Sequence, residues 1–245
     1  MRTSVKRCYM HRDADPDVTV LCFRHPHTVA NAQQTISNKA TQVHPIGEAQ
    51  IEHMIATALA EGATHFVTSM ADRTWGPAFL AVLSELGRSG VSLSSSPLFN
   101  EWEKPVALHG RGRDEPHLRE YLQKRIRNFG PDYVPVYEGE ETYKDSVNIV
   151  KEALLYFSKL GETHKVIAHF GHRNRTMMLK TRAVWGSLHP DLFKKYYYNS
   201  GFDNGAMFRI WYGLKFAPET GLAPEWDWCT DEGGNTHIPP PLRTS

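Results

Sequence analysis

Val18-Thr19-Val20-Leu21-Cys22-Phe23-Arg24-His25 is the stretch of this sequence that decides the fold. Pro16 precedes this apolar run, which ends in an arginine and a histidine. A second apolar run, Val166 to Ala168, ends at His169 in the same way. Short apolar runs bounded by turn residues are typical of buried strands in α/β proteins. Because ligands of such proteins bind outside the carboxyl ends of the strands, the two runs predict a site that holds both histidines.

The rest of the chain alternates strands with helices. Further strands are predicted at 66–68, 91–93 and 206–212, and helices at 51–59, 79–86, 118–129, 147–157 and 177–184. Apolar residues in the helical segments recur at the spacing of a helix face. This alternation predicts an α/β fold of three layers, a mostly parallel central sheet with helices on both faces. We expect one domain over 1–245, with an N-terminal arm (1–16), an insertion (94–141) and a loop-like C-terminal tail (218–245).

Composition limits the classes of function. The chain has 28 Lys and Arg residues against 27 Asp and Glu, so its net charge of +1 creates no global field that would attract nucleic acid or an anionic membrane. No segment is long and apolar enough to cross a bilayer, and acidic residues follow the basic N-terminus where a secretion signal requires an apolar run. Three widely spaced cysteines do not resemble a secreted disulfide framework. We expect a cytoplasmic protein that binds neither nucleic acid nor membrane, and a homo-oligomer stays open.

Arg24-His25-Pro26-His27-Thr28, followed by Asn31, resembles the Arg-His-Gly-x-Thr-x-x-Asn signature of the histidine phosphatase superfamily, the phosphoglycerate mutase-like group. Other segments are similar to that family in the same order along the chain: Gly47 with Gln50, Ser69 with Arg73, Phe99-Asn100-Glu101, the helix from Tyr143, and the strand that ends at His169. The resemblance covers about residues 18–212. Two positions depart from the pattern, since Pro26 and Phe170 stand where the family has glycine.

The resemblance implies a covalent mechanism that needs no metal and no cofactor. His25 attacks the phosphorus of a small phosphorylated substrate, and water hydrolyses the phosphohistidine. A neutral imidazole suits this role because its ordinary pKa of about 6.5 leaves most of it unprotonated near neutral pH. Arg24, Arg73 and His169 would bind the phosphoryl oxygens, and Asn31 would orient the phosphate or His25.

Further site residues follow from the same resemblance or from charge. Glu101 would protonate the leaving group and then activate water, with Glu103 as the alternative acid. His25, Glu101 and His169 are therefore the predicted catalytic residues. Arg173 and Arg175 follow His169 closely and are candidates for contact with an anionic substrate beyond its phosphate.

Three other functions stay open at this point. A mutase of the phosphoglycerate type would use the same phosphohistidine but return the phosphoryl group to a bound substrate. A catalytically silent protein that binds a phosphorylated ligand is compatible with Pro26 and Phe170. A metal hydrolase could use the spacings His25-x-His27 and His169-x-x-His172, although no aspartates lie near them to complete a dinuclear site.

Overall fold

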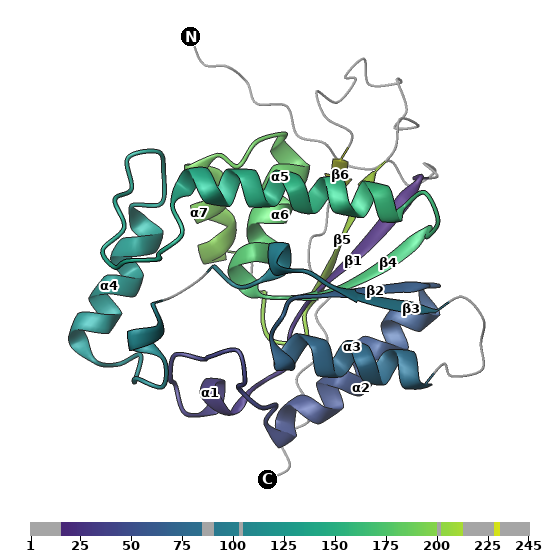
Figure 1. Ribbon diagram of the computed structural model, residues 1–245, viewed down its shortest axis with the longest axis horizontal. Coiled ribbons are helices and arrows are strands. Elements are labelled where there is room, and N and C mark those ends of the chain that lie inside the picture. The colour runs from purple at the N-terminus through teal and green to yellow at the C-terminus, as the bar shows by residue number, and fades with distance from the viewer. Residues whose placement is uncertain (1–15, 85–90, 103–104, 200–201, 213–227, 231–245) are drawn as a thin grey trace.

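The computed structural model describes residues 16–84, 91–102, 105–199, 202–212 and 228–230. Its centre is a six-stranded sheet in the order β3-β2-β4-β1-β5-β6 (Figure 1). The strands are β1 (Val18–Arg24), β2 (His65–Thr68), β3 (Ser92–Ser95), β4 (Val166–Gly171), β5 (Met207–Tyr212) and β6 (Trp228–Thr230). β3, β2, β4 and β1 run parallel to one another, and β5 is antiparallel to β1. The predicted α/β fold with a mostly parallel central sheet is thereby confirmed.

Helices cover both faces of the sheet, which explains the continuous apolar sequence of β1. Leu21 and Phe23 pack with α2 (Pro45–Ala60) and α3 (Asp72–Ser84) on one face. Val20 and Cys22 pack on the opposite face, with α5 (Tyr143–Leu160) and α6 (Arg173–Trp185). Both faces are visible in Figure 1, where α5 and α6 lie on one side of the sheet and α2 and α3 on the other.

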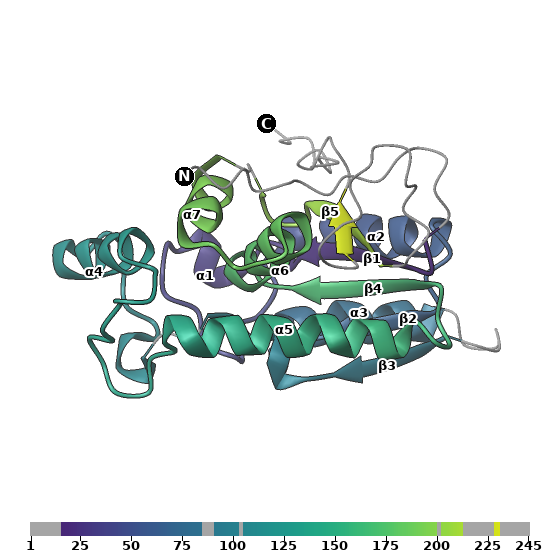
Figure 2. The same cartoon turned by 90° about the horizontal axis from the view of Figure 1, so that it is seen from above.

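The remaining elements gather beyond the carboxyl ends of the parallel strands. Figure 2 shows β4 and β3 pointing toward the end of the molecule that holds α1 (Val29–Ala32) and α4 (Pro116–Arg127). Two 3-10 turns, Pro97–Phe99 and Val106–Leu108, lie in the segment predicted as an insertion, and α7 (Pro190–Asn199) follows α6. The ends of the parallel strands are therefore enclosed by long connections, as a ligand site in this kind of fold requires.

Three sequence expectations differ from the structure or lie outside it. The tail predicted to be loop-like contains β6, which pairs with β5. Phe79, Leu80 and Leu83, which predicted a helix, do lie on α3, but each is exposed, and the helix buries its small residues Ala78 and Ala81 instead. The N-terminal arm, apart from Pro16, lies outside the described residues.

Among the residues that the structure describes, no helix has the length and apolar character needed to span a membrane.

Candidate active site

The pairing of β1 with β4 brings two histidines together, as predicted, but the histidine beside His25 is His172 and not His169. Arg24 pairs with Gly171 at the ends of these strands, so the next residues, His25 and His172, are equivalent in register. The His25 amide donates to the Gly171 carbonyl at 2.8 Å. The two imidazole rings lie 5.3 Å apart, centroid to centroid. Two parallel strands thus present one imidazole each at the same point of the sheet edge.

His169, predicted as a catalytic and phosphate-binding residue, does not lie at this point of the sheet edge, and His172 takes the place beside His25 that the prediction gave to it. β4 runs through Gly171, so His169 is inside the strand, and alternation turns it into the layer between the sheet and α5. Its ring is fully buried and packs against Phe99 at 4.7 Å and Phe157 at 5.5 Å, centroid to centroid. Gly171 leaves room for this ring, because a Cβ there would lie 2.4 Å from His169 Cε1. Burial lowers the pKa of His169 to about 3.

The His25 ring is held in an orientation that suits nucleophilic attack. Its Nδ1 lies 2.8 Å from the carbonyl oxygen of Pro26, which can only accept, so Nδ1 carries the proton and Nε2 carries the lone pair. Burial, Arg73 and Arg24 lower the pKa of His25 well below its ordinary value of 6.5, which keeps the ring neutral. Proline at position 26 therefore leaves this arrangement intact, because the carbonyl and not the amide positions the ring.

The loop after His25 is held by Gln50 of α2 and by Asn204, which lies in the turn before β5. The His27 amide donates to Gln50 Oε1 at 2.7 Å, and Gln50 Nε2 donates to the Asn204 carbonyl at 3.1 Å. The Asn204 side-chain amide donates to the carbonyls of His25 and Pro26, at 3.0 and 3.1 Å. Gly47 allows α2 this close to the loop, because a Cβ there would lie 2.3 Å from the His27 carbonyl oxygen. Asn204 was not predicted, and no local pattern marks it.

Arg73 and His172 form the part of the site that follows β2 and β4. Arg73 Nη2 donates to His172 Nδ1 at 3.3 Å, and its Nη1 donates to the Asn38 carbonyl at 2.6 Å. His172 Nε2 lies 2.7 Å from Ser69 Oγ, at the end of β2. Since arginine only donates, Nδ1 of His172 accepts and, in the neutral ring, Nε2–H donates to Ser69. Ser69 and Arg73, paired in the sequence resemblance, thus orient this second imidazole.

Arg24 enters the site from the end of β1. Its Nη1 donates to the Phe202 carbonyl at 2.8 Å, and its Nε is buried without a hydrogen-bond partner in the described part of the chain. Burial and the neighbouring Arg173 lower the pKa of Arg24 to about 10, a value at which the guanidinium still carries its charge at neutral pH. Arg24 therefore supplies a desolvated cation beside His25.

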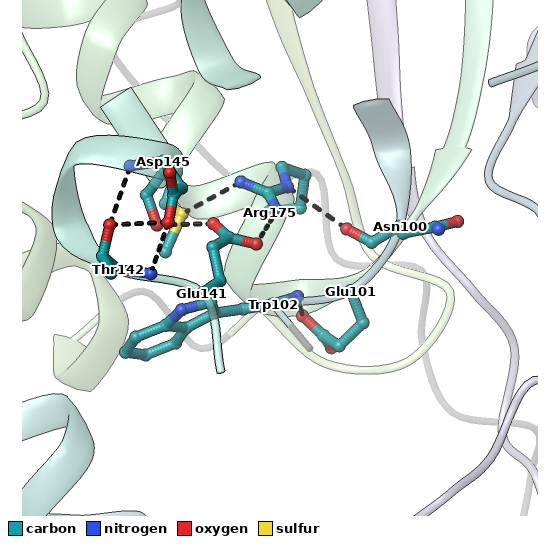
Figure 3. Close-up of polar contacts among 9 residues, drawn as sticks. Asn100, Glu101, Trp102, Glu141, Thr142, Asp145 and Arg175 are labelled. Carbon is teal, nitrogen blue, oxygen red and sulfur yellow. Dashed lines mark hydrogen bonds and ion pairs between the residues drawn. The ribbon is translucent and has the colours of Figure 1, made fainter. Parts of the chain in front are cut away.

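Glu101 lies between the two parts of the site, and Arg175 holds the segment that carries it (Figure 3). Glu101 Oε1 accepts from the Trp102 amide at 2.9 Å. Arg175 donates to the Asn100 carbonyl at 3.2 Å and to Glu141 at 2.6 Å, and its side chain is 1% exposed. Arg175, predicted to contact substrate, thus uses its guanidinium inside the protein, and it is not among the residues that line the cavities at this site. Glu103 lies outside the described residues.

Two adjoining cavities open at this site, and both include Ser37 and Glu101 in their walls. The first, of about 200 Å³, is walled by the predicted residues Arg24, His25, Asn31 and Arg173, and by Arg113, which lies in the segment 94–141. The second, of about 440 Å³, is walled by Arg73 and His172, and also by apolar residues such as Ala40 and Ala71. Asn31 also takes part in the capping box of α1, where its Oδ1 accepts from the amide of the N-cap residue Thr28. The site thus offers a cationic side and a roomier, less charged side, with Glu101 between them.

His25 and His27, whose spacing could suit a metal, face different neighbours in the structure. His27 packs edge-on against His44, with ring centroids 5.6 Å apart, whereas His25 faces His172. The described residues contain no group of three or more His, Cys, Asp or Glu side chains arranged to hold a metal ion.

The same fold occurs in solved structures of phosphatases. An α-ribazole-5′-P phosphatase, as assigned, from Escherichia coli K-12 superimposes with a TM-score of 0.64 at 17% identity, over 81% of this chain and 93% of that one. A mycobacterial glucosyl-3-phosphoglycerate phosphatase, solved with VO3, gives 0.62 at 14% identity, over 87% and 97%. A mutant phosphoserine phosphatase from Entamoeba histolytica, in complex with phosphoserine, gives 0.58 at 15%, over 81% and 93%. Neither family models nor curated protein sequences give a match to this chain. The chain has the fold of the histidine phosphatases.

Proposed function

We propose that this protein is a histidine phosphatase, which hydrolyses a small phosphomonoester through a phosphohistidine on His25. One observation carries the proposal: His25 is a buried neutral imidazole whose Nδ1 is bound to the Pro26 carbonyl, in a cavity that also holds Arg24 and Glu101. His172 and Arg73 stand directly beside it. Phosphatase structures with the same fold, one of them with bound phosphoserine, support the assignment.

The first half of the reaction forms the phosphoenzyme. The lone pair on His25 Nε2 forms a bond to phosphorus while the bond from phosphorus to the leaving oxygen breaks, and a protonated Glu101 gives its proton to that oxygen. Arg24 and Arg73 bind the charge of the phosphoryl oxygens without rearrangement, and His172 holds the Arg73 guanidinium in position. The imidazole becomes cationic, and the Pro26 carbonyl that accepts from Nδ1–H stabilises it.

The second half releases inorganic phosphate. Glu101, now a carboxylate, takes a proton from water as the water oxygen bonds to phosphorus and the bond between phosphorus and nitrogen breaks. Glu101 thus acts as a general acid in the first half and as a general base in the second. Its place in the walls of both cavities suits this double use.

The decisive experiment is to trap the intermediate. The enzyme is mixed with a ³²P-labelled aryl phosphate and quenched rapidly without acid. We expect label on His25, in a bond that is stable to base and labile to acid. His25→Ala should lose both label and turnover, while His27→Ala, in the same loop, should keep the label. Turnover should persist with a chelator, and inorganic phosphate should be the product. Absence of label from the wild type, or loss of turnover with the chelator, would refute the proposal. A phosphate isomer as the product would indicate a mutase.

A further inference from the structure

The cavity beside His25 contains more positive charge than one phosphoryl group requires. Arg24, Arg113 and Arg173 all line it, and Arg73 lies next to it in the adjoining cavity. Glu101 is the carboxylate whose field acts on Arg24, Arg73 and Arg113 together. A phosphoryl dianion held by Arg24 and Arg73 would leave Arg173 without a counter-charge, and Arg113 with only the field of Glu101.

Other arginines in the described part of the chain show how the fold normally neutralises such groups. Arg125, which also lines this cavity, has Glu140 at 2.7 Å, and Arg175 has Glu141 at 2.6 Å. By contrast, none of Arg24, Arg113 and Arg173 has a carboxylate within 4.0 Å among the described residues. Burial lowers the pKa of Arg24 and of Arg113, and cations in such surroundings are costly to leave unpaired. The three arginines are therefore arranged for an anion that comes from outside the protein.

Arg113 and Arg173 are fixed in place by backbone contacts, which leaves part of each guanidinium available. Arg113 Nε donates to the Thr35 carbonyl at 2.8 Å. Arg173 Nη2 donates to the Tyr197 carbonyl at 2.8 Å, and its guanidinium lies 4.7 Å from the centre of the Tyr197 ring. The Arg173 Nε is buried and has no hydrogen-bond partner within the described residues. Preorganised guanidinium groups of this kind bind the oxygens of phosphates in pairs.

We propose that the substrate carries a second phosphoryl group, which Arg113 and Arg173 bind in the cavity on the cationic side of His25. The inference rests on the proposed function and names its substrate class: a small molecule with two phosphoryl groups, one hydrolysed and one retained. Two guanidinium groups match the double charge of a second phosphoryl group better than the single charge of a carboxylate. The body of the substrate would lie along Ser37 and Glu101, which the two cavities share.

Binding of phosphonates, which are not hydrolysed, tests this inference without turnover. Isothermal titration calorimetry at constant ionic strength would compare ethylphosphonate with methylene-, ethylene- and propylenediphosphonate, and with phosphonoacetate. The best diphosphonate should bind about tenfold or more tightly than ethylphosphonate, in line with one or two added charge-assisted hydrogen bonds. Arg113→Met and Arg173→Met should each remove most of that advantage. Arg119→Met, an exposed position on α4 outside both cavities, is the control and should preserve it.

The outcomes separate this inference from the proposed function. If no diphosphonate binds more tightly than ethylphosphonate to the wild type, the inference is wrong, whether or not the two variants fold. If phosphonoacetate matches the best diphosphonate, the second group is a carboxylate and the substrate class is wrong. An enzyme that forms labelled His25 but shows no diphosphonate preference contradicts only the inference. A preference for diphosphonates without any labelled His25 contradicts only the proposed function.

Discussion

Replacing His169 by leucine should make the protein less sensitive to acid while sparing its activity. The His169 ring is fully buried, and both of its nitrogens lack a hydrogen-bond partner in the described part of the chain. Burial lowers its pKa to about 3, whereas in the unfolded chain the pKa returns to about 6.5. Below pH 6.5 the unfolded chain thus takes up a proton that the folded protein does not. The free energy of unfolding therefore falls as the pH falls from 6.5 toward 3.

The magnitude follows from this difference in pKa. Each pH unit well below 6.5 removes about 1.4 kcal/mol of stability, so the step from pH 7 to pH 5 removes about 2 kcal/mol through this one residue. His169→Leu abolishes that contribution. The variant's stability relative to wild type should hence rise by about 2 kcal/mol between pH 7 and pH 5. Phe157→Leu, a substitution in the same apolar cluster that removes no titratable group, should show a difference independent of pH.

Urea unfolding at the two pH values, followed by tryptophan fluorescence, measures the effect. Turnover of p-nitrophenyl phosphate at pH 7 is measured in parallel, and kcat/KM of His169→Leu should stay within about tenfold of wild type. A stability difference that does not change with pH would refute the buried neutral state of His169. A folded variant without activity would return His169 to the site and refute the assignment of His172.

Three further substitutions test the arrangement of the site. His172→Ala should lower kcat/KM for p-nitrophenyl phosphate by about 10², because it removes the acceptor that positions the Arg73 guanidinium; an unchanged value would refute this positioning role. Glu101→Gln should slow hydrolysis of alkyl phosphates far more than that of p-nitrophenyl phosphate, whose leaving group needs little protonation, and equal slowing across leaving groups would argue against an acid role. Gly47→Ala places a Cβ 2.3 Å from the His27 carbonyl oxygen and should destabilise the protein by about 1 to 3 kcal/mol in thermal unfolding, unlike Gly76→Ala, where a Cβ meets nothing within 4 Å.

The sequence predicts the layered sheet and the position of His25 because both depend on local signals. An apolar run that ends in Arg24 and His25 marks a buried strand and its tip, and the strand alternation extends this to the whole fold. The predicted tip of β4 was three residues early, since apolar character fades at His169 while the strand hydrogen bonds continue to Gly171. His172 could have been found from its place directly before the helical run that starts at Arg173, where a residue with extended backbone is needed.

Other parts of the site depend on contacts between residues far apart in the chain. Arg173 and Arg175 look alike in sequence, yet one lines a cavity and the other is paired with Glu141, which lies 34 positions earlier. Asn204 lies 179 positions after His25, whose carbonyl it binds. Side chains at such separations are brought together only by the folded sheet, and no spacing in the sequence encodes their partners.

The hydrogen bond from the His25 ring to the carbonyl of residue 26 leaves the residue type at that position open. Every amino acid has a carbonyl, so this contact places no demand on the side chain that follows the nucleophile, and here the ring of proline is accommodated. The contact therefore does not require glycine at position 26. A search pattern that requires glycine after the histidine would therefore miss a chain in which proline leaves the imidazole in the same orientation.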